Sequence, residues 1–376
     1  MQIPFLVPTV TGDERAALEA LLSRQPGGRD RAFSDACETK LAELSGTARV
    51  FGAPSCSAAL ELAALALGIA PGDEVIVPSF TFSSTANAFA LRGARIVFAD
   101  VRPDTMNLDE TRLEALITPR TRVIVPVHYA GVGCDMDAIM AIANRHRLFV
   151  VEDAAQAIGA RYKGRVLGTI GHMGAVSFHY TKNLQCGEGG ALFVRDDEMV
   201  RKVEILRENG TDRASFLRGE VDAYRWHAVG TNCRLSDVAA AHLLPQLERI
   251  DEIHSLRLER WHDYQQRLSP EGVEVMRPPA ECEHNAHIFF LKVQGDAAER
   301  NRWLRLLREH GVSATFHYVP LHSAPAGLSV GAMGGEDLHT TRESGRLIRL
   351  PLFHGLSAGQ VDRVCDLVLA LHRGAL

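Results

Sequence analysis

The stretch "EVIVPSFTFSSTANAFALRGARIVFADV" (residues 74–101) joins two short apolar runs through a segment with helical spacing. The runs "EVIVPS" (74–79) and "RIVFADV" (95–101) are rich in Val, Ile and Phe, and they do not alternate with polar residues. Continuous runs of this kind are typical of parallel strands that are buried on both faces of a sheet. The stretch therefore predicts a strand–helix–strand unit and an α/β fold.

The same alternation continues along the chain. Further strand-like runs and helical patterns follow in turn: strands at 121–128 and 148–155, and helices at 84–93, 108–117 and 135–147. They predict a mostly parallel central sheet with flanking helices. Three runs end in a polar residue, namely Asp100, His128 and Asp153. Ligands of open α/β sheets bind beyond the carboxyl ends of the strands, so these ends are where we look for chemistry.

The pattern changes beyond residue 182. The run "GGALFV" (189–194) predicts a strand antiparallel to 175–180 across a glycine turn. Residues 235–268 predict a long helical stretch with Ser236 as N-cap and a kink at Pro245. Later elements are expected as strands at 287–293 and 311–319 and helices at 298–311 and 357–374. We expect a large domain with an N-terminal arm over 1–245 and a smaller α+β domain over 246–376.

Composition narrows the class of protein. The chain has 376 residues, a net charge of −5 and dispersed lysines and arginines, so a nucleic-acid partner is not expected. Its seven cysteines include no C-x-x-C pair, which favours a reducing cytoplasm and argues against disulfides or a bound metal. The N-terminus lacks the basic region of a signal peptide, and no apolar run is long enough to cross a bilayer. We expect a cytoplasmic protein without a membrane partner.

Asp153 ends the buried run "LFVVEDAA" (148–155). Its ordinary interpretation is a helix N-cap. The alternative is a buried carboxylate kept ionised by a cation, because an unpaired charge would be costly there. The protonated ring nitrogen of pyridoxal phosphate is such a cation. The cofactor requires this charge, because the charged ring is what withdraws electrons from the reacting carbon.

This hypothesis predicts further parts, each of which also has an ordinary explanation. The cofactor needs an amine for a Schiff base, and Lys182 offers one in "SFHYTKNLQCGEGGALFV" (177–194), where the ordinary reading is an exposed turn lysine. Its phosphate needs a helix N-terminus together with hydroxyl groups. Cys56 and Ser57 begin an expected helix, and Ser177 could add a further hydroxyl. Its ring needs a flat neighbour, and Phe82 is suitably placed, although an isolated Phe is more often core.

Taken in order, the motifs resemble the DegT/StrS-type sugar-nucleotide aminotransferases, which are fold type I pyridoxal-phosphate enzymes. The resemblance rests on "PSCSAALELAAL", "GDEVIVPSFTFSSTANA", "DVRPDTMNLD", "VPVHYAG", "VVEDAAQAIGA", "SFHYTKN…GEGGAL", "GTNCRLSD" and "FHYVPLH". It covers nearly the whole chain. The dTDP-4-amino-4,6-dideoxygalactose transaminases are the subgroup that it resembles most.

The resemblance implies a role for each matching residue. Lys182 would form the Schiff base and shuttle the proton, and Asp153 would pair with the ring nitrogen. The other cofactor contacts would be Gln156 to the ring hydroxyl, Phe82 to the ring face, Cys56, Ser57 and Ser177 to the phosphate, and Asn232 to the phosphate of the other subunit. The last contact implies a homodimer with shared active sites. The sugar nucleotide would face His317, Tyr318 and His322.

The implied reaction moves an amino group from L-glutamate to a keto sugar nucleotide, with pyridoxamine 5'-phosphate formed between the two halves. The expected substrate is dTDP-4-keto-6-deoxyglucose and the product dTDP-4-amino-4,6-dideoxygalactose, in polysaccharide or lipopolysaccharide biosynthesis. A 3-keto or a UDP- or GDP-linked sugar is the alternative, as is a regulatory protein that binds the cofactor without turnover. A sugar dehydratase is disfavoured because those relatives replace the lysine with histidine. The chain departs from the family's sequence pattern at two places. It has Cys56-Ser57 where many relatives have Gly-Thr, and its segment at 25–38 is atypical.

Overall fold

The computed structural model describes residues 2–23, 31–47 and 49–376, so the first part of the atypical segment at 25–38 lies outside the described residues. Its centre is an eight-stranded sheet of order β1-β9-β8-β5-β4-β2-β3-β13. The strands are β1 (Arg49–Ala53), β2 (Glu74–Pro78), β3 (Arg95–Ala99), β4 (Thr121–Ile124), β5 (Phe149–Asp153), β8 (Met173–Ser177), β9 (Gly190–Val194) and β13 (Gly331–Met333). Within this sheet β9 runs antiparallel to β1 and β8, and the other pairings are parallel. The predicted α/β class and mostly parallel sheet are confirmed.

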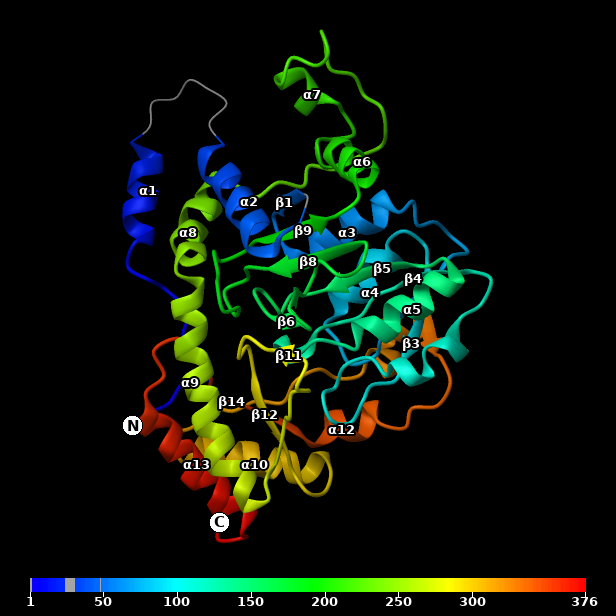
Figure 1. The fold of residues 1–376 in the computed structure, drawn as a ribbon. Coiled ribbons are helices and arrows are strands. Elements are labelled where there is room, and N and C mark those ends of the chain that lie inside the picture. Colours follow the sequence, from blue (N-terminus) through cyan, green and yellow to red (C-terminus); the bar gives the residue numbers. More distant parts are fainter. Residues whose placement is uncertain (1, 24–30, 48) are drawn as a thin grey trace.

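Helices cover both faces of this sheet (Figure 1). One face packs against α3 (Cys56–Ala66), α4 (Ser83–Ala90) and α6 (Asp197–Arg207), and the other against α2 (Ala32–Ser45), α5 (Met136–His146) and α8 (Asp237–Glu248). Strand β2 shows why its sequence does not alternate. Val75 and Val77 pack in the apolar layer between the sheet and α3, α4 and α6. Ile76 packs in the layer on the opposite face, with α2, α5 and α8, and all three side chains are fully buried.

A second, antiparallel sheet of order β10-β12-β14 lies toward the end of the molecule that carries the C-terminus (Figure 1). It consists of β10 (Glu274–Val275), β12 (Phe289–Lys292) and β14 (Leu347–Leu350), with α9 (Ile250–Leu268), α10 (Ala297–Glu309) and α13 (Ala358–His372) around it. The remaining elements are α1 (Glu14–Leu22), α7 (Arg213–Leu217), α11 (Pro325–Val330), α12 (Thr340–Arg346) and a small sheet of β6 (Arg161–Tyr162), β7 (Arg165–Val166) and β11 (Cys282–Glu283). We propose that the two domains divide near residue 245, with β13 returning to the edge of the large sheet.

Three local predictions differ from the structure. Residues 108–117 form two 3-10 turns, Glu110–Arg112 and Glu114–Leu116, instead of a helix. Pro119 follows closely and disfavours helical geometry in the residue before it, so the segment is too short to propagate. The stretch 311–319 makes only isolated bridges, at Val312 and Thr315.

The third difference concerns the helix break. Ser236 caps α8 as predicted, since its side chain accepts a hydrogen bond from the Ala239 N–H. The helix continues through Pro245 to Glu248, however, and the next helix begins at Ile250. The kink predicted at Pro245 is therefore replaced by a break at Arg249, four residues farther along the chain.

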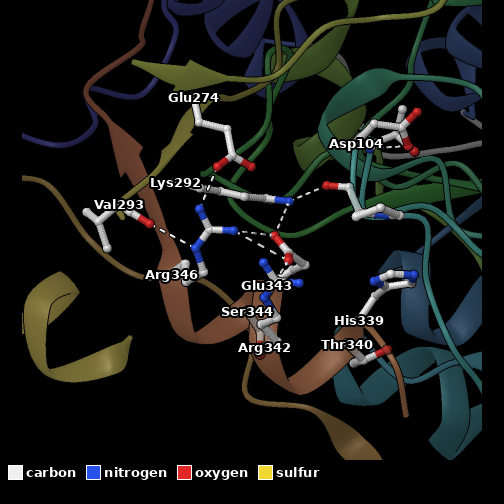
Figure 2. Close-up of polar contacts among 12 residues, drawn as sticks. Asp104, Glu274, Lys292, Val293, His339, Thr340, Arg342, Glu343, Ser344 and Arg346 are labelled. Atoms are coloured by element: carbon white, nitrogen blue, oxygen red, sulfur yellow. Dashed lines mark hydrogen bonds and ion pairs between the residues drawn. The ribbon is translucent and has the colours of Figure 1, made fainter. Parts of the chain in front are cut away.

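A buried ion network ties the small sheet to its surroundings (Figure 2). The Lys292 amine on β12 lies 2.8 Å from a Glu343 carboxylate oxygen and also donates to the Pro103 carbonyl. The Arg346 guanidinium bonds Glu343 at 3.1 Å and Glu274 at 2.5 Å. Lys292 and Glu343 are nearly inaccessible, so each charge depends on the others for compensation.

Candidate active site

The buried carboxylate of Asp153 ends β5, and only 4% of the residue is exposed. Its Oδ2 accepts a hydrogen bond from the Thr85 hydroxyl at 2.7 Å, and its Oδ1 accepts one from the Ala155 N–H at 3.1 Å. Thr85 in turn lies 2.8 Å from the Thr81 hydroxyl, which must donate because the Thr85 proton goes to Asp153. Among the described residues no cation forms an ion pair with this carboxylate, so the protonated nitrogen of a pyridine ring fits the site.

Lys182 lies in the loop between β8 and β9, and its backbone N–H donates to the His179 carbonyl at 2.8 Å. Burial of the amine lowers the pKa of Lys182 from 10.5 to about 8, partly opposed by Cys56 and Asp153 and assisted by Arg349. No hydrogen bond to the Lys182 amine occurs within the described ranges. A neutral, unengaged amine is what Schiff-base chemistry requires.

Gln156, the residue expected to bond the ring hydroxyl, is buried three residues after Asp153. Its side-chain oxygen accepts from the Ala130 N–H at 2.7 Å, and its amide nitrogen donates to the Tyr318 hydroxyl at 3.0 Å. The His317 and Tyr318 rings are stacked, with centroids 3.7 Å apart. Two of the predicted substrate residues therefore line the same site as Gln156.

The aromatic group around Tyr318 extends to both sides of the site. The Phe82 ring lies 6.3 Å from the Tyr318 ring and is 57% exposed, so it is available to cover a ligand. On the other side, His317 Nδ1 lies 2.7 Å from the buried Tyr129 hydroxyl. Burial, with Arg349 and Lys182 nearby, holds the pKa of His317 well below its usual range, so this ring is neutral at physiological pH.

The proposed phosphate cradle is brought together by a close backbone contact. Cys56 and Ser57 begin α3, while Ser177 ends β8 and is paired with Gly190 on β9. A Cβ at Gly190 would lie 2.4 Å from the Cys56 nitrogen, so glycine lets the helix N-terminus approach the end of β8. The first N–H groups of a helix lack internal partners and attract anions, so a phosphate fits here. The Cys56 thiol stays neutral, since burial raises its pKa well above the usual value.

Two predicted residues are not joined to this cluster within the described chain. Asn232 is exposed and lies in the loop that precedes α8, and no hydrogen bond joins it to Lys182 or Asp153. His322 is held between the Ser79 hydroxyl at 2.7 Å and the Asp337 carboxylate at 3.4 Å. Its ring thus fastens the segment after Tyr318 to the end of β2.

The other two polar strand ends have structural roles. His128 bonds the buried Glu152 carboxylate at 2.8 Å, and Asp100 accepts hydrogen bonds from backbone groups at the start of α12, including the Thr340 N–H. Only Asp153 of the three therefore faces the candidate site. The sequence interpretation missed Thr81, Thr85, Tyr129 and Arg349. The threonines stand within the quoted motif around Phe82, whereas "RLIRLPLF" around Arg349 carried no such signal.

Two kinds of feature are absent from the described residues. No group of three or more His, Cys, Asp or Glu side chains is arranged to hold a metal ion. No helix within the described ranges is long and apolar enough to span a membrane.

Comparison with known proteins gives the same assignment. The model of the DegT/DnrJ/EryC1/StrS aminotransferase family matches residues 9–369. The chain is 37% identical over 346 residues to the spore coat polysaccharide biosynthesis protein SpsC of Bacillus subtilis, covering 90% of this chain and 89% of the relative. It is 37% identical over 343 residues to GDP-perosamine synthase of Caulobacter vibrioides, covering 89% and 86%.

A solved structure shows the likeness in three dimensions. A protein described as a sugar aminotransferase, Spr1654 of Streptococcus pneumoniae, superposes with a TM-score of 0.90 in its PLP-form, at 26% identity and covering 100% of both chains. Its PMP-form gives the same TM-score at 27% identity, covering 100% of this chain and 98% of that one.

Proposed function

Because the chain belongs to the DegT/DnrJ/EryC1/StrS aminotransferase family, we propose that it transfers the amino group of L-glutamate to a keto sugar nucleotide. It is a sugar aminotransferase that uses pyridoxal phosphate, with a pyridoxamine phosphate form between its half-reactions. The observation that carries the proposal is the Lys182 amine, whose pKa burial lowers to about 8, near the Asp153 carboxylate, which has no cationic partner among the described residues. Binding without turnover would require no base at this position.

The chain's own residues would divide the work as follows. When bound, pyridoxal phosphate withdraws electrons from the substrate carbon that loses its proton. Asp153, fixed by Thr85, would keep the ring nitrogen protonated. The Lys182 amine would take the proton from the α-carbon of the donor, and it would act as the base at the sugar carbon in the second half-reaction, as reversibility requires.

The remaining contacts would orient the groups. The N-terminus of α3, with Ser57 and Ser177, would bind the phosphate, and Phe82 would lie against the ring. Gln156 would bond the ring hydroxyl, with Tyr318 beside it. His317, Tyr318 and His322 would form the wall that faces the sugar nucleotide.

For the substrate we propose dTDP-4-keto-6-deoxyglucose, with dTDP-4-amino-4,6-dideoxygalactose as the product. The motifs "RPDTMNLDET", "PVHYAGVGCDMD" and "FHYVPLHSAPAG" support this choice. A GDP-linked sugar is the second candidate, and the likeness to GDP-perosamine synthase supports it.

We also propose a homodimer in which each subunit completes the other's site. Asn232 is exposed and makes no hydrogen bond to Lys182 of its own chain, which supports this arrangement. All seven cysteines are unpaired, which supports a reducing compartment such as the cytoplasm.

The experiment has two steps. The purified protein, loaded with pyridoxal phosphate, should show a visible absorbance band that borohydride bleaches and that Lys182→Ala lacks. Unlabelled keto sugar nucleotides with dTDP, UDP or GDP should then be incubated with ¹⁵N-glutamate, and NMR of the product reports the aminated carbon and its configuration. If the wild-type protein binds the cofactor but glutamate never converts it to the pyridoxamine form, the proposed function is wrong.

A further inference from the structure

Arg349 lies on β14 at the position where the small sheet meets the candidate active site. Arg349 is paired with Phe290 on β12, and the Phe290 ring lies 5.7 Å from the Tyr129 ring. Its backbone also exchanges two hydrogen bonds with Thr315, at 2.7 Å and 3.1 Å. Thr315 precedes His317 by two residues, so the strand holds Arg349 beside the segment that carries His317 and Tyr318.

The guanidinium of Arg349 has no anionic partner among the described residues. Its Nε is inaccessible and makes no hydrogen bond, and its face lies over the Phe5 ring at 4.8 Å. Arg257 shows the ordinary solution for a buried arginine, since it donates to the carbonyls of Ala286, His287 and Leu352 at 2.9–3.1 Å. A buried donor without a partner is costly, so the unpaired guanidinium indicates a place for an external anion.

The charge of Arg349 acts on the reacting groups. It contributes to the lowered pKa of Lys182 and of His317, and it opposes the rise that burial causes in the pKa of Tyr318. The guanidinium therefore lies within electrostatic reach of the Lys182 amine, the His317 ring and the Tyr318 hydroxyl. An anion bound there would therefore lie close to the amine.

We propose that Arg349 binds the α-carboxylate of the amino donor. Guanidinium and carboxylate form a planar, two-bond pair, which fixes orientation as well as position. The α-carboxylate is attached to the carbon that carries the transferred amine, so it must lie beside Lys182. The diphosphate of a keto sugar nucleotide is attached to another carbon of the sugar, farther from the reacting carbonyl. This assignment rests on the proposed function, and it adds a residue that selects the donor.

The kinetic test separates the two half-reactions in the holoenzyme. Arg349→Gln should raise the apparent KM for glutamate roughly 10- to 100-fold, the range expected for lost bonds to a charged group. In the second half-reaction, started from protein loaded with pyridoxamine phosphate, the KM for the sugar nucleotide should change less than about threefold. Arg349→Lys, which keeps the charge, should recover part of the loss. Arg300→Gln is the matched control, because Arg300 stacks on Phe316 but donates to the Ser344 carbonyl and should be neutral.

A binding test does not depend on turnover. 2-Methyl-L-glutamate has no α-proton to lose, so calorimetric titration into the holoenzyme measures donor binding alone. Its affinity should fall in Arg349→Gln by the same factor. Wild type should also discriminate strongly against glutamate 1-amide, whose α-carboxylate is blocked, and Arg349→Gln should lose that discrimination while treating glutamine (the 5-amide) as wild type does.

The outcomes are distinct. A rise in the sugar-nucleotide KM with unchanged donor binding would show that Arg349 serves a phosphate, and the proposal would be overturned. Unchanged donor binding and unchanged KM values would leave a structural role only, which also overturns it. If wild type fails to transaminate any amino acid, the proposed function fails, while the titration still tests Arg349. If Arg349→Gln does not match wild type in circular dichroism, Arg349→Lys carries the comparison.

Discussion

The amine of Lys182 is set for chemistry by its surroundings. Burial disfavours the charged form and lowers the pKa to about 8, while the negative charge of Asp153 limits the shift. By contrast, the exposed amine of Lys163 has a raised pKa because it bonds the Asp137 carboxylate. The two lysines therefore differ in the pH at which a neutral amine becomes available.

This difference predicts a pH profile for chemical labelling. Only the neutral amine reacts, so labelling of Lys182 in cofactor-free protein should rise with pH, reach half its maximum near pH 8 and then level off. Labelling of Lys163 should still be rising at the highest pH tested. Trace acetylation between pH 6 and 10, read by mass spectrometry, checks both. Parallel profiles for the two lysines would contradict the lowered pKa.

At the scale of elements, the N-terminus of α3 and the strand pair β8–β9 act as one unit. Gly190 sits at the contact, where a Cβ would lie 2.4 Å from the Cys56 nitrogen and 2.5 Å from the Ser55 carbonyl carbon. Backbone atoms cannot rotate away as a flexible side chain can. The distance between the helix terminus and Ser177 therefore depends on this glycine.

Gly190→Ala should lower the free energy of unfolding by about 1–3 kcal/mol and weaken cofactor binding, because the helix must move away from the strands. Chemical denaturation and a fluorescence titration with pyridoxal phosphate measure the two effects. Gly359→Ala is the control: its Cβ would meet no atom within 4 Å in α13, so that variant should be neutral or more stable. Equal stability of the two variants would argue against the contact.

At the scale of the whole molecule, the network in Figure 2 links three parts of the chain through Lys292, Glu343 and Arg346. Glu343→Gln would leave both cations without this carboxylate in a buried place. We expect a loss of about 3–5 kcal/mol in unfolding free energy, measured by denaturation. Glu271→Gln, which breaks the exposed pair with Arg373, should cost less than about 1 kcal/mol. Similar losses would mean that burial of the network contributes little.

The proposed dimer makes a separate prediction. If Asn232 of one subunit completes the site of Lys182 in the other, Lys182→Ala and Asn232→Ala should each be nearly inactive alone. Subunits mixed by refolding should recover up to about a quarter of the activity, since half of the dimers are mixed and each has one intact site. Activity that stays at the level of the separate variants would count against shared sites.

Sequence alone determined the elements whose physical signal is local. The apolar runs of β2, β3, β4 and β5 are continuous because both faces of each strand are buried, and the Ser236 cap is a contact within one turn. The motif resemblance also selected Lys182, Asp153 and Gln156 before their geometry was known. The helix expected at 108–117 was wrong because its apolar spacing did not reveal how short the segment is.

The tertiary structure decided which of these residues act together. Asp100, His128 and Asp153 look alike at strand ends, but their partners differ. Three N–H groups and one hydroxyl donate to Asp100, and Glu152 binds His128. Asp153 accepts one bond from Thr85 and one from the Ala155 N–H, and no cation pairs with it among the described residues. Arg349 stands in an apolar run with no motif around it. Its missing partner is visible only when β14, the segment before Tyr318 and the loop of Lys182 come together. The physical reason is that local sequence sets backbone propensity and burial, whereas compensation of charge depends on groups that lie far apart in the chain.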